Sequence, residues 1–270
     1  MSLSGWLFAC LYDRLTSSVE AAGLRARREQ LLGNALGRVL EIGAGTGANL
    51  PFYGPGVESI TAAEPETPMA RKLAQRIREQ RRVVEVVQAP AEQLPFADAQ
   101  FDTVVSTLVL CTVNDLARTL SEVRRVLKPG GRLLFIEHVR SEEPRLAAWQ
   151  DRLNGLNRIV AHGCNCNRST LDAIRAAGFT VTSLEQGNLA KAPPFVRPLI
   201  VGTAEAHTAR RRGRRIRTIG RRVHVIHNGP TAAWRASRAR QRLVTSEIIS
   251  ISADGSGRSS VRNRMLAVLR

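Results

Sequence analysis

Apolar segments typical of β-strands alternate with helix-like segments along the first three quarters of the chain. The strand-like segments cover residues 38–43, 59–64, 83–88, 101–106 and 132–138. Strands that alternate with helices form a parallel sheet covered by helices on both faces. The pattern therefore predicts an α/β fold with a doubly wound, mostly parallel sheet, whose ligands bind beyond the carboxyl ends of the strands.

Residues with helical spacing fill the intervals between these strands. The helix-like segments are an opening region at 6–32, a stripe at positions 69, 73 and 77, a stripe over 116–127 and a segment near 169–177. The second helix is expected to begin at Thr67-Pro68, a good N-cap and first-turn pair.

The last two apolar segments, 179–184 and 198–203, have no helix between them. We expect them to form an antiparallel pair at the edge of the sheet. After Ala206 the periodicity is lost. We therefore expect one domain over residues 1–206, which includes a helical cap at 1–37, followed by a disordered tail at 207–270.

The charge of the chain divides at the same boundary. The whole sequence holds 40 Lys and Arg against 23 Asp and Glu, a formal net charge of +17. Residues 1–206 carry 24 basic and 21 acidic side chains, whereas residues 207–270 carry 16 basic side chains, all Arg, and 2 acidic ones. The excess positive charge, which taken whole suggests a nucleic-acid binder, therefore belongs to the tail.

Three interpretations of the tail stay open. It is an appendage without a selected role, it binds RNA or DNA through phosphates, or it holds the protein on an anionic membrane. Only Trp234 is aromatic there, which leaves little for base stacking. Nucleic acid or an anionic membrane would thus be a partner only through the tail, and no obligate protein partner is inferred.

The composition favours a cytoplasmic protein, with peripheral attachment to a membrane as the alternative. No window approaches the roughly 20 apolar residues of a membrane helix, and the stretch at 6–12 is too short for a secretion signal. The four cysteines are too few for a disulfide framework and are expected to be reduced. No metal is expected at His162, Cys164 and Cys166, which lack C-x-x-C spacing and a second ligand pair.

A glycine-rich turn follows the first predicted strand and matches two cofactor patterns. Gly43, Gly45 and Ala48 have the dinucleotide spacing G-x-G-x-x-G/A, while Glu41 followed by Gly43, Gly45 and Gly47 fits E-x-G-x-G-x-G. A dinucleotide brings a pyrophosphate to the helix N-terminus, which the carboxylate of Glu41 would repel. The residues therefore favour a cofactor with cationic groups.

The second pattern resembles the glycine loop of the S-adenosylmethionine-dependent methyltransferases, whose cofactor carries an ammonium and a sulfonium group. Three further features resemble this family in order and spacing: Glu64 at the end of the second strand, the segment Ala89-Pro-Ala-Glu92-Gln-Leu-Pro-Phe96 and the turn Arg125-Val-Leu-Lys-Pro-Gly-Gly131. The resemblance implies a seven-stranded Rossmann-like methyltransferase fold of type 11, with S-adenosylmethionine as the cofactor.

The same resemblance implies which residues bind the cofactor. Glu64 would accept the ribose hydroxyls, and adenine would meet the Ala91 backbone and Glu92, because Pro90 replaces the usual aspartate of that turn. The cofactor-binding residues expected in this way are Glu41, Gly43, Gly45, Gly47, Asn49, Glu64, Ala91, Glu92 and Thr107.

Four segments narrow the resemblance to the methyltransferase-like thiol S-methyltransferases and their bacterial homologues, over about residues 6–205. These segments are 45–53, 106–113, 135–139 and 163–168. We therefore expect a small-molecule acceptor, a thiol first, with a phospholipid amine or a quinone carbon as alternatives. The competing class is a nucleic-acid-binding or nucleic-acid-modifying protein, although Ser106-Thr-Leu-Val stands where amino-directed nucleic-acid methyltransferases carry N-P-P-Y.

His138 is the candidate general base. It ends the fifth predicted strand, where the sheet opens to the acceptor, and a thiol with a pKa near ~8.5 is only partly ionised at neutral pH. The alternative is a histidine that is hydrogen-bonded in a loop and moves no proton. Tyr12, Cys111 and Cys164 are expected to join His138 around the acceptor. The alternatives are a tyrosine that packs between helices for Tyr12 and a buried structural cysteine for Cys111.

Overall fold

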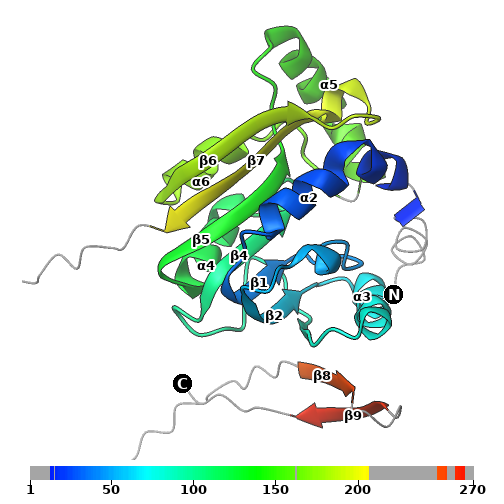
Figure 1. Ribbon diagram of the computed structural model, residues 1–270. Helices are drawn as coiled ribbons and strands as arrows, with labels where there is room; N and C mark the ends of the chain where they lie inside the picture. Colours follow the sequence, from blue (N-terminus) through cyan, green and yellow to red (C-terminus); the bar gives the residue numbers. More distant parts are fainter. Residues whose placement is uncertain (1–12, 15, 162, 207–247, 254–258, 265–270) are drawn as a thin grey trace, which may run out of the picture.

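The computed structural model describes residues 13–14, 16–161, 163–206, 248–253 and 259–264 (Figure 1). Tyr12 and His162 lie outside the described residues.

A mixed sheet forms the centre of the molecule, with strands in the order β6-β7-β5-β4-β1-β2-β3-β8-β9. Its first seven strands along the chain are β1 (Gly37–Ile42), β2 (Val57–Ala63), β3 (Glu85–Val87), β4 (Phe101–Thr107), β5 (Leu127–His138), β6 (Phe179–Asn188) and β7 (Pro198–Ala206). Neighbours among β1 to β5 run parallel, whereas β7 is antiparallel to both β5 and β6. The predicted doubly wound fold and its antiparallel pair at the edge are confirmed.

Helices cover both faces of the sheet (Figure 1). They are η1 (Glu20–Leu24), α2 (Arg25–Leu32), η2 (Leu50–Phe52), α3 (Thr67–Gln80), α4 (Leu116–Val126), α5 (Pro144–Val160), α6 (Thr170–Ala176) and η3 (Pro194–Val196). None of the helices in these described ranges is long and apolar enough to cross a lipid bilayer.

Alternate residues of the central strands bury two hydrophobic clusters, one on each face of the sheet. Val104 and Phe135 pack with α4 and α6 on one face, while Val105 and Ile136 pack with α2 and α3 on the other. The alternation follows from the two-residue repeat of a strand. It also fixes which face each polar residue at a strand end points to.

Two helices differ from the sequence expectation. Thr67 is the first residue of α3 and Glu66, whose backbone is extended, takes the N-cap position, so the prediction that Thr67 caps this helix is wrong. Helix α5 was not predicted, because the side chains that it buries include the polar residues Gln150 and Asn157.

Two further strands lie in the segment where the sequence predicted no regular structure. Strand β8 (Ile248–Ala253) pairs antiparallel with β3, and β9 (Ser259–Arg264) pairs antiparallel with β8. They extend the sheet by two strands beyond the seven of the predicted fold. The rest of the expected tail, residues 207–247, 254–258 and 265–270, lies outside the described residues.

Candidate active site

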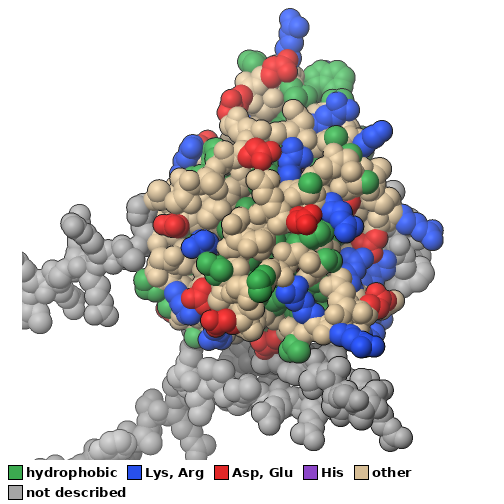
Figure 2. All heavy atoms as spheres, viewed as in Figure 1, with side chains coloured by type: hydrophobic (Ala, Val, Ile, Leu, Met, Phe, Trp, Pro, Cys, Tyr) green, Lys and Arg blue, Asp and Glu red, His purple; other side chains and the backbone are tan. Residues whose placement is uncertain are grey.

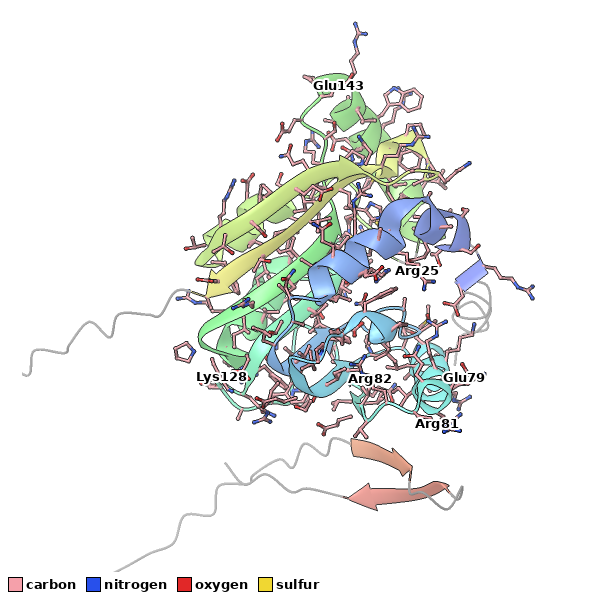
Figure 3. All side chains as sticks on the ribbon, viewed as in Figure 1. Arg25, Glu79, Arg81, Arg82, Lys128 and Glu143 are labelled. Atoms are coloured by element: carbon pink, nitrogen blue, oxygen red, sulfur yellow. The ribbon has the colours of Figure 1, made fainter. Side chains whose placement is uncertain are left out.

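The carboxyl ends of β1, β2, β4 and β5 meet at one edge of the sheet, because these strands are parallel. Three connections begin there: the glycine loop at 43–49, Glu64 after β2, and the β4–α4 loop at residues 108–115. Figure 3 shows Lys128 near the start of β5 and Glu143 beyond its end, at opposite sides of the molecule. The candidate active site lies at the edge on the Glu143 side.

The glycine loop is shaped by positive backbone angles. The φ values of Gly43, Gly45 and Gly47 are 57°, 56° and 82°, which favour glycine. A Cβ at Gly43 would lie 2.6 Å from Cγ2 of Val109, whereas one at Gly45 would meet no atom closer than 4.0 Å. Gly43 therefore lets the β4–α4 loop pack against the glycine loop, and Gly45 leaves space for a ligand.

Glu64 joins the end of β2 to the glycine loop. Its Oε2 accepts a hydrogen bond of 2.7 Å from the amide of Gly45, and its Oε1 accepts one of 2.9 Å from the amide of Glu66. Burial raises the pKa of this carboxyl group, which the two amide donors partly offset. Each oxygen keeps a second lone pair, so the carboxylate is held beside the open face of Gly45 with acceptors to spare.

Glu41 is buried on the α2 side of β1, with 2% of its surface exposed. Its Oε1 accepts from Nδ2 of Asn49 at 2.9 Å, and its Oε2 accepts from the hydroxyl of Tyr53 at 2.7 Å. Burial raises the pKa of Glu41 from 4.5 to about 7, although both hydrogen bonds act against this shift. The group therefore titrates near neutrality, where a cation placed beside it would favour the ionised form.

Arg28 of α2 is a buried cation that sequence reasoning missed. Its Nη1 donates to Oδ1 of Asn49 at 2.6 Å, and its Nη2 donates to Oε1 of Glu20 at 2.9 Å. The positive charge also lowers the pKa of Glu41. Arg28 thus ties the N-terminal helices to the glycine loop, but the many arginines around it give no local pattern that would single it out.

Thr107, Ala91 and Glu92 have different surroundings. Oγ1 of Thr107 accepts from Nδ2 of Asn49 at 3.1 Å, which places Thr107 beside Glu41. Ala91 packs in a hydrophobic cluster. Oε1 of Glu92 accepts a hydrogen bond of 2.8 Å from the backbone amide of Asn114, just before α4. The structure therefore brings Thr107 to the glycine loop, while the carboxylate of Glu92 is already bonded at the start of α4.

Glu137 holds the β4–α4 loop from the sheet side and was not predicted as a site residue. Its Oε1 accepts from the hydroxyl of Ser106 at 2.6 Å and from the amides of Val109 and Leu110 at 3.2 and 3.1 Å. Its Oε2 accepts from the amide of Cys111 at 3.3 Å. Because the side chain is fully buried, these donors replace the water that a carboxylate otherwise binds.

Arg168 holds the same loop through its carbonyl groups. Nη1 donates to the carbonyl of Leu110 at 2.6 Å and Nη2 to that of Val113 at 2.7 Å. Nearby, the amide of Asn165 donates to the carbonyl of Cys111 at 2.8 Å. The segment 163–168, singled out in the sequence, thus positions the β4–α4 loop.

Cys111 and Cys164 are brought together but are not open to solvent. Their Sγ atoms lie 3.7 Å apart and their exposed fractions are 1% and 6%. The hydrogen bond with Cys164 and burial raise the pKa of the Cys111 thiol. Within the described part of the chain, no group of three potential metal-binding side chains comes together. The two thiols therefore pack against each other behind the β4–α4 loop.

His138 points to the face of the sheet opposite Glu137, because successive strand residues alternate. Its Nδ1 is buried without a hydrogen-bond partner among the described residues. Burial lowers the pKa of His138 from 6.5 to about 4. The imidazole is therefore neutral at pH 7 and accepts a proton only weakly.

The strand order with an antiparallel β7, and a glycine loop between acidic residues at the ends of β1 and β2, define an S-adenosylmethionine-dependent methyltransferase fold. The methyltransferase domain family of type 11 matches residues 40–135. The crystal structure of YcgJ from Bacillus subtilis, 19% identical, superposes with a TM-score of 0.57 over 69% of this chain and 99% of that chain. That likeness shows the fold.

Two curated relatives show how far the similarity extends. Human thiol S-methyltransferase TMT1A is 38% identical over 170 residues, 62% of this chain and 69% of the relative. Phosphatidylethanolamine N-methyltransferase of Cereibacter sphaeroides is 34% identical over 119 residues, 43% of this chain and 58% of the relative. The chain belongs to the type 11 S-adenosylmethionine-dependent methyltransferases, and S-adenosylmethionine is its cofactor.

Proposed function

We propose that this methyltransferase acts on the sulfur of a small thiol. The observation that carries the proposal is the alignment with thiol S-methyltransferase TMT1A, at 38% identity against 35% for malonyl-[acyl-carrier protein] O-methyltransferase of Erwinia pyrifoliae. It covers 170 residues, whereas the shared methyltransferase domain covers only residues 40–135. The similarity thus extends beyond the residues that the domain family matches.

The residues at the carboxyl edge of the sheet fit the cofactor. When bound, S-adenosylmethionine supplies a methyl group on a sulfonium that a nucleophile attacks. Gly45 leaves space for the cofactor, and the fixed carboxylate of Glu64 offers free lone pairs to the ribose hydroxyls. Glu41, with a pKa of about 7, would hold the α-ammonium group as an ionised partner.

The β4–α4 loop would position the acceptor. It packs on Gly43 through Val109, and it is held by Glu137 from one side and by Arg168 from the other. In-line displacement needs the nucleophile about 3 Å from the methyl carbon, which is mostly a matter of positioning. A rigid loop beside the glycine loop supplies this positioning without a reacting side chain.

The thiol would lose its proton before attack, to solvent rather than to His138. A neutral imidazole with a pKa of about 4 is a weak base for a thiol whose pKa is near ~8.5. The rate should therefore follow the thiolate fraction of the acceptor. The dependence of the rate on the thiol's own pKa therefore distinguishes a structural His138 from a His138 that acts as the base.

The test is the pH dependence of kcat/KM for two thiols of different pKa, with the S-methyl product identified by mass spectrometry. We expect the midpoint of each profile to move with the thiol used. A midpoint that stays fixed for both thiols and disappears in His138→Gln would restore His138 as the base. If the protein binds S-adenosylhomocysteine but methylates no thiol, the proposed acceptor is wrong.

A further inference from the structure

Helix α5 (Pro144–Val160) buries polar side chains against the rest of the protein. Gln150 and Asn157 have exposed fractions of 0% and 8%. Nε2 of Gln150 lies within 3.0 Å of three backbone carbonyl oxygens, and Nδ2 of Asn157 donates to the carbonyl of Cys164 at 2.8 Å. Amide hydrogen bonds therefore attach the helix to the protein, together with the buried Ala147.

The outside of α5, in contrast, carries exposed apolar side chains. Trp149, Leu156, Ile159 and Val160 are exposed by 64%, 62%, 79% and 70%. Three of them, at positions 149, 156 and 160, follow the i, i+7, i+11 spacing of a single helix face. Helix geometry places this face about 90° around the axis from Gln150 and Asn157. We call Trp149, Leu156 and Val160 the outward stripe.

Positive charge borders the outward stripe. Arg145 and Arg152 are exposed, and the helical repeat places them next to Trp149 and Leu156. Asp151, the acidic residue within α5, lies on another side of the helix and pairs with Arg140. Figure 2 shows hydrophobic, basic and acidic side chains side by side at the end of the molecule where α5 lies. The exposed acidic residues Glu142 and Glu143 precede the helix, whereas Arg145 and Arg152 lie within it.

We propose that the outward stripe of α5 docks on the surface of an anionic lipid bilayer. An interfacial helix presents Trp and aliphatic residues to the acyl chains and basic residues to the headgroups. The long side chains of Arg145 and Arg152 can reach lipid phosphates while their methylene groups cover apolar surface. The apolar stripe with a basic margin has this composition.

A second copy of the chain fits the outward stripe less well than a bilayer. A helix of 17 residues is about 25 Å long, so a strip about 10 Å wide offers on the order of 250 Å². A stable protein interface buries about 800 Å² on each partner. A bilayer needs no such matched area, because apolar side chains insert into it individually.

Docking through α5 would turn the candidate active site towards the bilayer. Helix α5 follows the carboxyl end of β5, the edge where the glycine loop and the β4–α4 loop lie (Figure 1). Asn157 also ties α5 to Cys164, in the segment that positions the β4–α4 loop. The inference does not depend on which acceptor is methylated.

The experiment uses the full chain with Trp6→Phe and Trp234→Phe, so that Trp149 is the one fluorophore of its kind. Vesicles of phosphatidylcholine, with or without phosphatidylglycerol, are added at physiological ionic strength, and Trp149 emission distinguishes docking through α5 from binding through residues 207–270. We expect a blue shift of Trp149 emission with the anionic vesicles, and quenching by lipids brominated on their acyl chains.

The variant Leu156→Glu/Val160→Glu should weaken vesicle binding by at least about tenfold, since two apolar side chains no longer insert. Val83→Glu is the matched control, because Val83 is also 79% exposed but lies just before β3; its binding should equal that of the parent. Far-UV circular dichroism and S-adenosylhomocysteine binding confirm that both variants are folded.

Three results would overturn the proposal. The first is vesicle binding without any change in Trp149 emission, which would assign binding to another part of the chain. The second is no vesicle binding. The third is a Trp149 spectrum that is already blue-shifted without lipid and moves with protein concentration in sedimentation equilibrium, which would make the stripe an interface between two copies.

Discussion

Glu137 and Arg168 bind the same loop through opposite backbone groups. The carboxylate of Glu137 accepts hydrogen bonds from three consecutive amides of the β4–α4 loop, and the guanidinium of Arg168 donates to two of its carbonyls. The loop is therefore fixed between a buried anion and a cation, next to the glycine loop.

Replacing Glu137 should loosen the β4–α4 loop. In Glu137→Gln the side-chain NH2 group would face backbone amides that also donate, and unsatisfied buried donors cost about 1–3 kcal/mol. We expect the free energy of unfolding in urea to fall by that amount, and kcat to fall more than cofactor affinity. Glu185→Gln removes an exposed partner of Arg27 and serves as the control; equal losses in both variants would contradict the role of Glu137.

The contact between Gly43 and Val109 makes a second prediction. Gly43→Ala places a methyl group 2.6 Å from Cγ2 of Val109 at a positive φ, and should destabilise the protein by about 2–3 kcal/mol. Adding Val109→Ala relieves the clash but not the backbone strain, so the double variant should be more stable than the sum of the single effects.

Gly155→Ala in α5 provides the control for the glycine series. A Cβ at Gly155 meets nothing within 4 Å and the position is helical, so alanine should stabilise the protein by about 0.5–1 kcal/mol.

Thermal or urea unfolding measures the effects of Gly43→Ala and Val109→Ala singly and together. If the two effects add strictly, the glycine loop and the β4–α4 loop are not in tight contact at these residues.

Glu41 makes stability depend on pH. Its pKa is about 7 in the folded protein against 4.5 for the free group. Between these values the folded state keeps a proton that the unfolded state has released, so the free energy of unfolding falls as pH rises, by about 3 kcal/mol in all. Burial raises the pKa of Glu64 and Glu137 as well, which acts in the same direction.

Urea unfolding at several pH values from 5 to 8 measures this dependence. Glu41→Gln has no proton to release and can still accept from Asn49, so its stability should decline less steeply with pH than that of the wild type. Parallel curves for the two proteins would show that Glu41 is ionised in the folded state across this range.

Cys111 and Cys164 should be dispensable for methyl transfer. Both thiols are buried, and the raised pKa of Cys111 keeps it protonated at neutral pH. Each Cys→Ala variant should lose about 1–2 kcal/mol of stability from lost packing and keep kcat within a factor of a few. Loss of all turnover in a folded variant that still binds S-adenosylhomocysteine would make one of these thiols part of the chemistry.

Local patterns predicted the fold. The alternating strands follow from the spacing of apolar residues, whereas the expected roles of the glycine loop and Glu64 rest on the resemblance of short segments to a family. The contacts of Glu137 and Arg168 join residues 26 to 58 positions apart, and no spacing rule covers such pairs. Arg28 was not predicted because its partner Asn49 is also distant in the sequence and because Arg28 lies among other arginines of α2.

The burial of polar side chains explains the two clearest differences between the sequence expectation and the structure. Helix α5 buries Gln150 and Asn157 and exposes Trp149, which reverses the pattern that marks a helix packed on a core. His138 lies at the predicted strand end, but the pattern could not show how strongly burial would change its proton affinity.

Competition among acceptors shows directly whether the enzyme methylates a thiol. The full chain is incubated with methyl-labelled S-adenosylmethionine and an equal mixture of a small thiol, a phosphatidylethanolamine vesicle and a reduced quinone, and labelled products are counted by mass spectrometry. We expect label on the thiol, at a kcat/KM far above that for the other two. Label on the lipid amine or the quinone carbon, with the thiol unlabelled, would contradict this expectation.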